Sequence, residues 1–148
     1  MTRIDVIKLT MVKERTMPYD GNRKMGSSTD AERLLRQYFG DADREMFVAL
    51  LLSTKHYVNG IHTVSIGSLD GTIVHPREVF KAAIIANAQT IIVGHNHPSG
   101  DVTPSQEDCN VTNRLVASGK LLGIEVLDHL IIGDGRFSFR EHGMLLDA

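Results

Sequence analysis

The stretch IIVGHNHPSGDVTPSQED, residues 91–108, contains the strongest structural and chemical signals in this chain. Its first residues are apolar and β-branched, which predicts a buried strand over residues 90–95. His95 and His97 come at the end of that strand, and alternation along extended backbone points both side chains to the same face. A loop rich in glycine and proline then turns the chain into a helix. The segment therefore predicts a strand–loop–helix unit with polar side chains at the junction.

The helix after this loop carries an acidic residue where an apolar one is expected. Thr103 is expected to cap it, with Pro104 at its first position and Gln106 completing a capping box, and the helix is expected to end near residues 118–119. Asp108 lies on the stripe of this helix that packs inward. Because an unpaired carboxylate is costly to bury, the sequence predicts a charged partner for Asp108.

A metal ion is the partner that the spacing favours. His95, His97 and Asp108 form a ligand set that zinc accepts, with bonds of about 2 Å. Three protein ligands leave one position open for water, which is typical of catalytic zinc, whereas structural zinc is usually closed by four. Ser105 is expected on the same helix face as Asp108, where its hydroxyl could donate to an oxyanion. A single histidine beside a strand is more often an ordinary core or surface residue, but the combined spacing favours the metal site.

The remaining segments predict a mixed α/β fold. Strands are expected over residues 3–13, 45–53, 56–67 and 90–95 and in a closing hairpin over 121–133 and 136–139, and helices from Thr29 to about Gly40 and over 76–88. Thr29 and Glu32 fit a capping box, and Asp70–Gly71 fits a tight turn. Strands and helices alternate in the middle of the chain and strand pairs flank them, which indicates a mixed sheet with helices packed against it.

Composition and charge narrow the class of protein. The 148 residues suit one domain, and the net charge of −2 argues against direct nucleic-acid binding and a membrane surface as partner. The chain has neither an apolar run of membrane-spanning length nor an export leader, so we expect a cytoplasmic protein. Cys109 is the only cysteine, which excludes an internal disulfide and agrees with a reducing compartment.

The segment GHNHPSGDVTPSQED, residues 94–108, resembles the JAMM (MPN-plus) metalloprotease motif. That motif is an upstream glutamate, then His-x-His, seven residues, Ser, two residues and Asp, and the spacing from His95 to Asp108 matches it completely. The surrounding sequence is similar to one bacterial branch, the RadC-like proteins. The segments that carry this second resemblance are VSIGSLDGTIVHPREVFKAAIIANA, HNHPSGD and VLDHLIIGDGRFSFREHG, and together they extend it over roughly residues 28–146.

The resemblance implies a cytidine-deaminase-like JAB/MPN fold with one zinc ion per chain. His95, His97 and Asp108 would bind the zinc, Ser105 would stabilise the oxyanion, and an upstream glutamate would act as general base. The implied reaction is hydrolysis of a peptide or isopeptide bond in a peptide or protein substrate. Residues 1–28 would then be an N-terminal strand and connector, and residues 29–148 the hydrolase domain.

The general base has to be chosen among several glutamates. The candidates near the expected core are Glu32, Glu45, Glu78, Glu107 and Glu125. Glu45 begins an apolar strand, and its position matches the glutamate of the RadC branch. Glu78 suits the first turn of a helix, where a carboxylate favours the helix dipole. We therefore expect Glu45 to be the base; its alternative is a solvated charge beside Arg44.

The sequence leaves two alternatives to the hydrolase. One is a RadC-like interaction module in DNA repair or recombination, with a mainly structural metal site. The helix-hairpin-helix region of longer RadC proteins is not visible here, which weakens that reading. The other is a zinc nucleobase deaminase, but its cysteine ligands are not supplied by Cys109 alone.

The sequence also predicts roles for polar residues at three further places. His75 is expected either to cap the helix that begins at Pro76 or to orient a ligand. One member of the pair Asp128–His129 must face inward, and we expect either support of a ligand histidine or plain strand polarity. Asn96 is expected to point away from the metal and to fix the loop.

Overall fold

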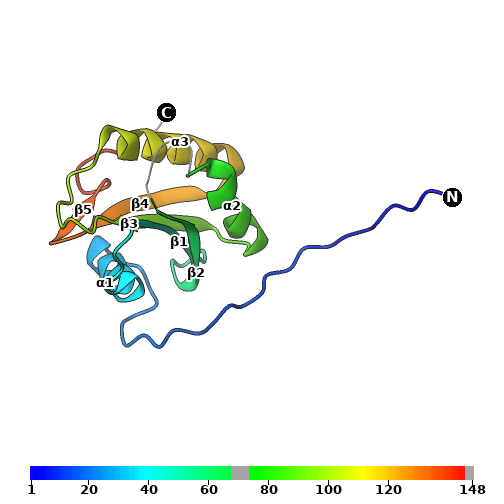
Figure 1. The fold of residues 1–148 in the computed structure, drawn as a ribbon, viewed down its shortest axis with the longest axis horizontal. Helices are drawn as coiled ribbons and strands as arrows, with labels where there is room; N and C mark the ends of the chain where they lie inside the picture. Colours follow the sequence, from blue (N-terminus) through cyan, green and yellow to red (C-terminus); the bar gives the residue numbers. More distant parts are fainter. Residues whose placement is uncertain (68–73, 146–148) are drawn as a thin grey trace.

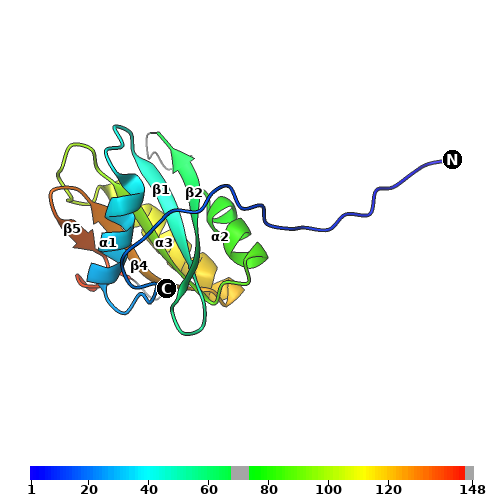
Figure 2. The same cartoon turned by 90° about the horizontal axis from the view of Figure 1, so that it is seen from below.

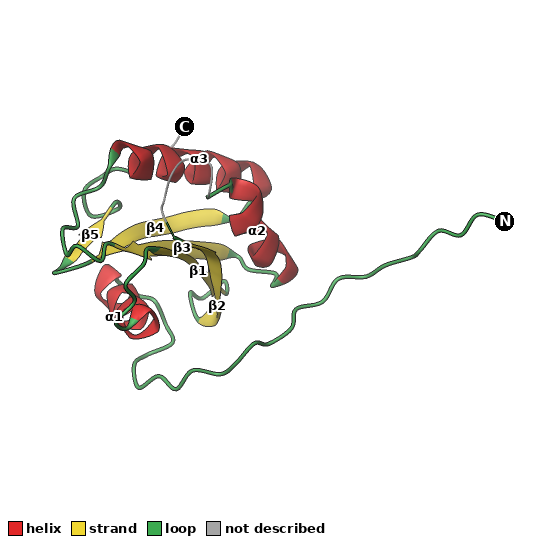
Figure 3. Ribbon diagram, viewed as in Figure 1, coloured by secondary structure: helices red, strands yellow, loops and turns green. Residues whose placement is uncertain are grey.

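The computed structural model describes residues 1–67 and 74–145 and confirms a mixed α/β fold (Figures 1 and 3). The elements, in chain order, are α1 (Ser28–Phe39), β1 (Met46–Leu52), β2 (Val58–Ile66), α2 (Pro76–Ile85), β3 (Thr90–Asn96), α3 (Gln106–Leu122), β4 (Glu125–Ile132) and β5 (Arg136–Ser138). No helix within the described ranges has both the length and the apolar character needed to cross a membrane.

The five strands form one sheet in the order β2-β1-β3-β4-β5. β1 pairs antiparallel with β2 and with β3, β3 pairs parallel with β4, and β4 and β5 form the closing hairpin. Phe47 lies opposite His95 in this register, and Asn96 lies opposite Ile132. The carboxyl ends of β3 and β4 therefore lie beside the beginning of β1, at one end of the strands.

Helices cover both faces of the sheet. α2 and α3 lie on one face and α1 lies on the other (Figures 1 and 2). Each face buries its own apolar cluster: Phe47, Val93 and Leu115 belong to the α2/α3 cluster, and Leu35 and Leu50 to the α1 cluster. Burial of apolar area on both faces supplies most of the driving force for this arrangement.

Gly94 permits the close packing of α1 on β3. A Cβ atom built on Gly94 would lie 2.6 Å from Leu35 Cδ1, well inside normal contact distance. The buried Leu35 side chain therefore occupies the space that any other residue at position 94 would fill. His95, the next residue along β3, faces the opposite side of the sheet.

The prediction of a strand over residues 3–13 is wrong. This segment has no regular secondary structure, and residues 1–16 are exposed and run out from the body of the protein (Figures 1 and 2). Ile4, Val6 and Leu9 keep at least 74% of their surface exposed. Their alternating pattern finds nothing to pack against within the described chain.

Both predicted capping boxes are also wrong. Ser27, not Thr29, caps α1 and accepts the N–H of Asp30. α3 begins at Gln106 rather than near Thr103, because Ser105 is its capping residue. In each case a serine two residues from the predicted threonine supplies the cap, before it in α1 and after it in α3.

Other boundaries shift by a few residues. α3 continues to Leu122, where Gly123 ends it with a positive φ of 74°, so residues 121 and 122 are helical and not part of the last hairpin. α2 ends at Ile85, three residues before the predicted end at residue 88. The predicted turn at Asp70–Gly71 lies outside the described residues.

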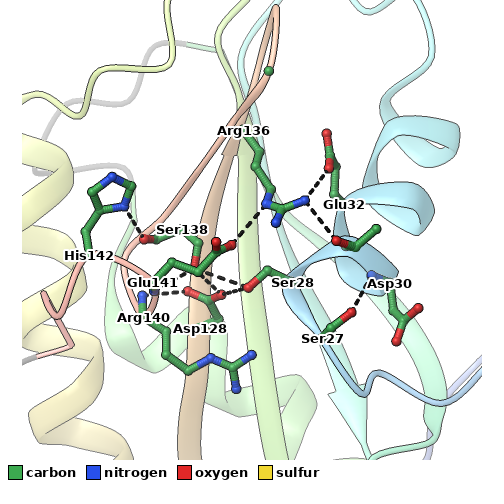
Figure 4. A network of polar contacts seen from close by, with 12 residues as sticks. Ser27, Ser28, Asp30, Glu32, Asp128, Arg136, Ser138, Arg140, Glu141 and His142 are labelled. Atoms are coloured by element: carbon green, nitrogen blue, oxygen red, sulfur yellow. Dashed lines mark hydrogen bonds and ion pairs between the residues drawn. The ribbon is translucent and has the colours of Figure 1, made fainter.

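A buried carboxylate joins the last hairpin to α1 (Figure 4). Asp128 Oδ2 accepts the hydroxyls of Ser138 at 2.6 Å and Ser28 at 3.1 Å. Its Oδ1 accepts the N–H groups of His129 at 2.7 Å and Arg140 at 3.0 Å. Nearly complete hydrogen bonding explains how the fold tolerates a carboxylate that is 1% exposed.

Candidate metal centre

Three donor side chains converge at the carboxyl end of β3. His95 Nε2 lies 3.0 Å from His97 Nε2 and 3.3 Å from Asp108 Oδ1, and His97 Nε2 lies 3.5 Å from Asp108 Oδ2. Two ligands of a tetrahedral zinc ion, each bonded at about 2.05 Å, are about 3.3 Å apart. These residues are the group within the described chain that could hold a metal ion, and their spacing fits zinc.

The surroundings of the site favour the metal-binding forms of its groups. Burial lowers the pKa of His95 despite the neighbouring Asp108, so the imidazole stays neutral near neutral pH. Burial alone would raise the pKa of Asp108, but its contact with His95 and the N–H of Ser105 outweigh burial and hold that pKa well below its usual range. Neutral imidazoles and an ionised carboxylate are the forms that bind divalent cations.

His97 is oriented by the loop that follows it. Its Nδ1 lies 2.7 Å from the carbonyl oxygen of Asp101, and since a carbonyl only accepts, Nδ1 carries the proton. In the neutral ring the other nitrogen, Nε2, then presents its lone pair to His95 and Asp108. Gly100, with φ of 95°, lets the loop turn back toward His97 at this point.

Ser105 and Asp108 form the capping box of α3. Ser105 Oγ accepts the N–H of Asp108 at 3.0 Å, and Asp108 Oδ2 accepts the N–H of Ser105 at 2.8 Å. Ser105 therefore lies beside the ligand carboxylate, as the spacing predicts, but at the helix cap instead of within the helix. The hydroxyl hydrogen of Ser105 is not used in the bond to Asp108.

Glu45 immediately precedes β1 and lies on the metal side of the sheet. Phe47, two residues further, faces the same side and stacks on His95, with ring centroids 5.9 Å apart. Extending the antiparallel register of Phe47 and His95 by two residues would place Glu45 opposite His97. The negative charge of Glu45 contributes a small upward influence to the pKa of His95.

Asn96 fixes the backbone on both sides of Glu45. Its amide oxygen accepts the N–H of Met46 at 2.7 Å, and its amide nitrogen donates to the carbonyl of Arg44 at 3.0 Å. Asn96 thus points away from the metal donors, as expected, but it holds the entry to β1 and not its own loop. The Glu45 carbonyl in turn accepts the N–H of Gly67 at 2.7 Å.

His129 lies directly behind His95. Its Nε2 is 2.8 Å from His95 Nδ1, and its Nδ1 is 2.6 Å from the hydroxyl oxygen of Thr112. Of the Asp128–His129 pair, His129 faces the donor side and contacts His95, whereas Asp128 is a polar residue on the α1 side. Each of the two roles expected for the pair therefore applies to one of its members. Thr112 was not singled out from the sequence, although its position four residues after Asp108 on the inward stripe is a usable signal.

The other candidate glutamates lie elsewhere. Glu32 lies on the opposite side of the sheet, where it pairs with Arg36. It also pairs with Arg136, as Figure 4 shows. Glu78 pairs with Lys81 on an exposed turn of α2. Glu125 begins β4, at the end of the sheet away from the metal donors, and Glu107 is exposed.

His75 and Cys109 have plain structural settings. His75 caps α2 by accepting the N–H of Arg77 through Nδ1 at 3.0 Å, which is the first of the two roles expected for it. Cys109 is a free, half-buried thiol on α3.

A groove on the α1 side of the sheet reaches one of the three donors, His97. It has a volume of about 400 Å³, and its lining includes His97, Asn96, Arg36, Asp41 and Asp134. The groove joins the end of α1, the loop after β3 and the turn between β4 and β5. An elongated ligand placed in it would lie directly beside the exposed side of His97.

Comparison with known proteins identifies the family. The model of the RadC-like JAB domain matches residues 25–144. A UPF0758 protein of Rubrobacter xylanophilus is 51% identical over 125 residues, 84% of this chain and 55% of that protein. A UPF0758 protein of Moorella thermoacetica is 57% identical over 117 residues, 78% of this chain and 51% of that protein. A third UPF0758 protein, from Methanosarcina mazei, is 47% identical over 131 residues, 88% of this chain and 57% of that protein.

The chain spans about half the length of these curated relatives. Its five-stranded mixed sheet with three helices agrees with a JAB domain, and its His-His-Asp cluster lies where the strand and helix of the matched region meet. The protein belongs to the RadC-like JAB domain family.

Proposed function

We propose that this domain is a zinc-dependent hydrolase that cleaves a peptide or isopeptide bond. The observation that carries the proposal is the convergence of one donor atom from each of His95, His97 and Asp108, all within 4.8 Å of one another, near a glutamate and the hydroxyl of Ser105. A purely structural site needs neither Glu45 nor Ser105. Zinc, when bound, supplies the Lewis acidity that polarises a carbonyl and makes water acidic near neutral pH.

Glu45 acts as the general base. Its carboxylate takes a proton from the attacking water as the water oxygen forms a bond to the carbonyl carbon. The C–N bond then breaks, and the leaving nitrogen receives the proton that Glu45 holds. The net reaction adds one water across the bond and returns Glu45 to its ionised form. Asn96 keeps the backbone of Glu45 in register with His97 while this occurs.

Ser105 stabilises the carbonyl oxygen as it gains charge. The Ser105 oxygen already accepts the N–H of Asp108, which orients the hydroxyl without consuming its hydrogen. One preorganised donor of this kind is worth about 10²–10³ in turnover in other hydrolases.

The first test is metal stoichiometry followed by cleavage assays. Wild type, His95→Ala and Asp108→Ala are purified without added metal, then loaded with zinc, and the metal is measured by elemental analysis. The exposed His142 lies outside the cluster, so His142→Ala is the matched control. Zinc-loaded wild type and zinc-free protein are then assayed on mixtures of fluorogenic peptides and of lysine-linked isopeptides.

We expect about one zinc per chain in wild type and in His142→Ala, and a large loss in the two site variants. We expect cleavage only by the zinc-loaded forms that retain the site. Wild type that takes up no divalent metal would overturn the metal centre, and equal cleavage with and without zinc would overturn the hydrolase mechanism.

A further inference from the structure

Four residues close a ring of contacts behind the metal donors. Thr112 Oγ1 donates to the carbonyl oxygen of Asp108 at 2.7 Å and lies 2.6 Å from His129 Nδ1. His129 Nε2 lies 2.8 Å from His95 Nδ1, and His95 Nε2 lies 3.3 Å from the carboxylate of Asp108. The ring thus begins and ends on one turn of α3. It joins two proposed metal ligands through two residues that are not ligands.

The direction of the hydrogen bonds in this ring follows from counting hydrogens. A hydroxyl has one hydrogen, and Thr112 gives it to a carbonyl, which can only accept. Thr112 Oγ1 must therefore accept from His129, so His129 carries its proton on Nδ1. A neutral imidazole has one N–H, so His129 Nε2 accepts from His95 Nδ1.

The last step leaves the lone pair of His95 on Nε2. That nitrogen is the one that faces His97 and Asp108. If the direction were reversed, His95 would carry its proton on Nε2 and would have to lose it before binding a metal. The direction is anchored at Thr112, because the partner of its hydroxyl is a helix carbonyl that can only accept.

The packing around these four residues prevents the imidazole groups of His95 and His129 from turning. His95 and His129 have no exposed surface and Thr112 has 1%. His129 stacks on Phe139 at 4.7 Å with an angle of 10°, and it meets Phe47 edge-on at 5.5 Å. Water has no access to supply a substitute hydrogen-bond partner, so each hydrogen bond in the ring depends on its neighbour.

We infer that Thr112 and His129 are positioning residues that set the tautomer of His95 and so prepare its Nε2 for the metal. The inference rests on the proposed metal centre. The hydroxyl of Thr112 fixes which nitrogen of His129 carries the proton. His129 in turn fixes which nitrogen of His95 carries the proton. Neither residue touches the metal or the substrate.

Two variants of Thr112 separate the hydroxyl from the shape of the side chain. Thr112→Val keeps the shape and removes the hydroxyl, while Thr112→Ser keeps the hydroxyl and removes a methyl group. Zinc affinity is measured by competition with a chelator, with zinc alone as the probe. We expect Thr112→Val to bind zinc about 10–100-fold more weakly than wild type and Thr112→Ser to bind nearly as tightly as wild type. Circular dichroism and thermal unfolding verify that each variant folds.

The tautomers are read directly from the metal-free protein by long-range ¹H–¹⁵N NMR of the imidazole rings. We expect both His95 and His129 to be protonated on Nδ1 in wild type and in Thr112→Ser. We expect the proton of His129 to move to Nε2 in Thr112→Val, because its Nδ1 has lost its buried acceptor. This measurement requires neither zinc nor catalytic activity.

Several results would overturn the inference: a wild-type His129 protonated on Nε2, a Thr112→Val variant that binds zinc as tightly as wild type, or equal losses in Thr112→Val and Thr112→Ser. The spectra of wild type decide the matter if Thr112→Val does not fold. Failure of wild type to bind any divalent metal would instead remove the proposed function, and the tautomers of the metal-free protein would still test the ring.

Discussion

Ser105 and Asp108 each accept the backbone N–H of the other, at 3.0 and 2.8 Å, at the start of α3. This reciprocal pair has two consequences. It satisfies two of the unpaired N–H groups at the end of the helix, and it holds the ligand carboxylate with Oδ1 directed at His95. Stability and the position of a proposed metal ligand are therefore coupled at one residue pair.

Ser105→Ala should reduce both stability and turnover. Loss of the cap should lower the free energy of unfolding by about 1 kcal/mol. Loss of the oxyanion donor should lower kcat by about 10²–10³-fold. Urea unfolding and steady-state kinetics measure the two effects separately. Ser105→Thr retains a capping hydroxyl and should preserve most of the stability. Complete loss of turnover in Ser105→Thr would contradict the role of the hydroxyl as oxyanion donor.

Glu45→Gln should keep zinc and lose catalysis. The amide is nearly isosteric with the carboxylate, but it cannot take a proton from water. We expect unchanged metal stoichiometry and a fall in kcat of about 10²–10⁴-fold. Glu107→Gln, at an exposed position on α3, is the control and should behave as wild type. Wild-type turnover in Glu45→Gln would exclude Glu45 as the base.

The metal donors could be predicted from sequence because their geometry is local. A two-residue spacing on a strand and a carboxylate on the next helix place His95, His97 and Asp108 together once the loop turns back. Glu45 is fifty residues away in sequence, and only the pairing of β1 with β3 brings it to His97. The resemblance to a family motif, rather than periodicity, selected it among the glutamates.

The errors of prediction have physical causes as well. Ile4, Val6 and Leu9 alternate as a strand would, but alternation has no effect without a partner surface. Thr29 and Thr103 satisfy the capping-box pattern, but Ser27 and Ser105 satisfy the backbone geometry. The ring through Thr112 and His129 could not be read at all, since it depends on the packing of α3 against β4.

Asn96→Ala should reduce turnover without reducing zinc affinity. The substitution removes the hydrogen bonds to Arg44 and Met46, so the backbone that carries Glu45 loses its fixed position. A displacement of about 1 Å at a catalytic group can cost about 10²-fold in rate. We also expect a loss of about 1–3 kcal/mol in stability, because two partly buried backbone groups lose their hydrogen-bond partner. Kinetics and zinc titration of the same samples test this, with the exposed Asn113→Ala as control. Equal losses of zinc affinity and turnover would show that Asn96 supports the metal ligands instead.

Glu32 should make the stability of the protein depend on pH. Burial raises the pKa of Glu32, but hydrogen bonds and charge from Arg136 and Arg36, each 2.8 Å away, outweigh it and lower that pKa. The unfolded chain therefore takes up a proton at higher pH than the folded protein. The stabilisation is complete above the unfolded pKa of about 4.3 and is lost as the pH falls through the lower, folded pKa.

Glu32→Gln should accordingly destabilise the protein by about 1 kcal/mol at neutral pH, since it breaks two ion pairs, one with Arg36 within α1 and one that links α1 to Arg136 of β5. The difference between Glu32→Gln and wild type should shrink as the pH falls below about 4, where the wild-type carboxylate also becomes neutral. Urea unfolding at a series of pH values measures it, with the exposed Glu107→Gln as the matched loss of one charge. A difference that stays constant from neutral to acid pH would mean that the side chain of Glu32 contributes through packing and not through its charge.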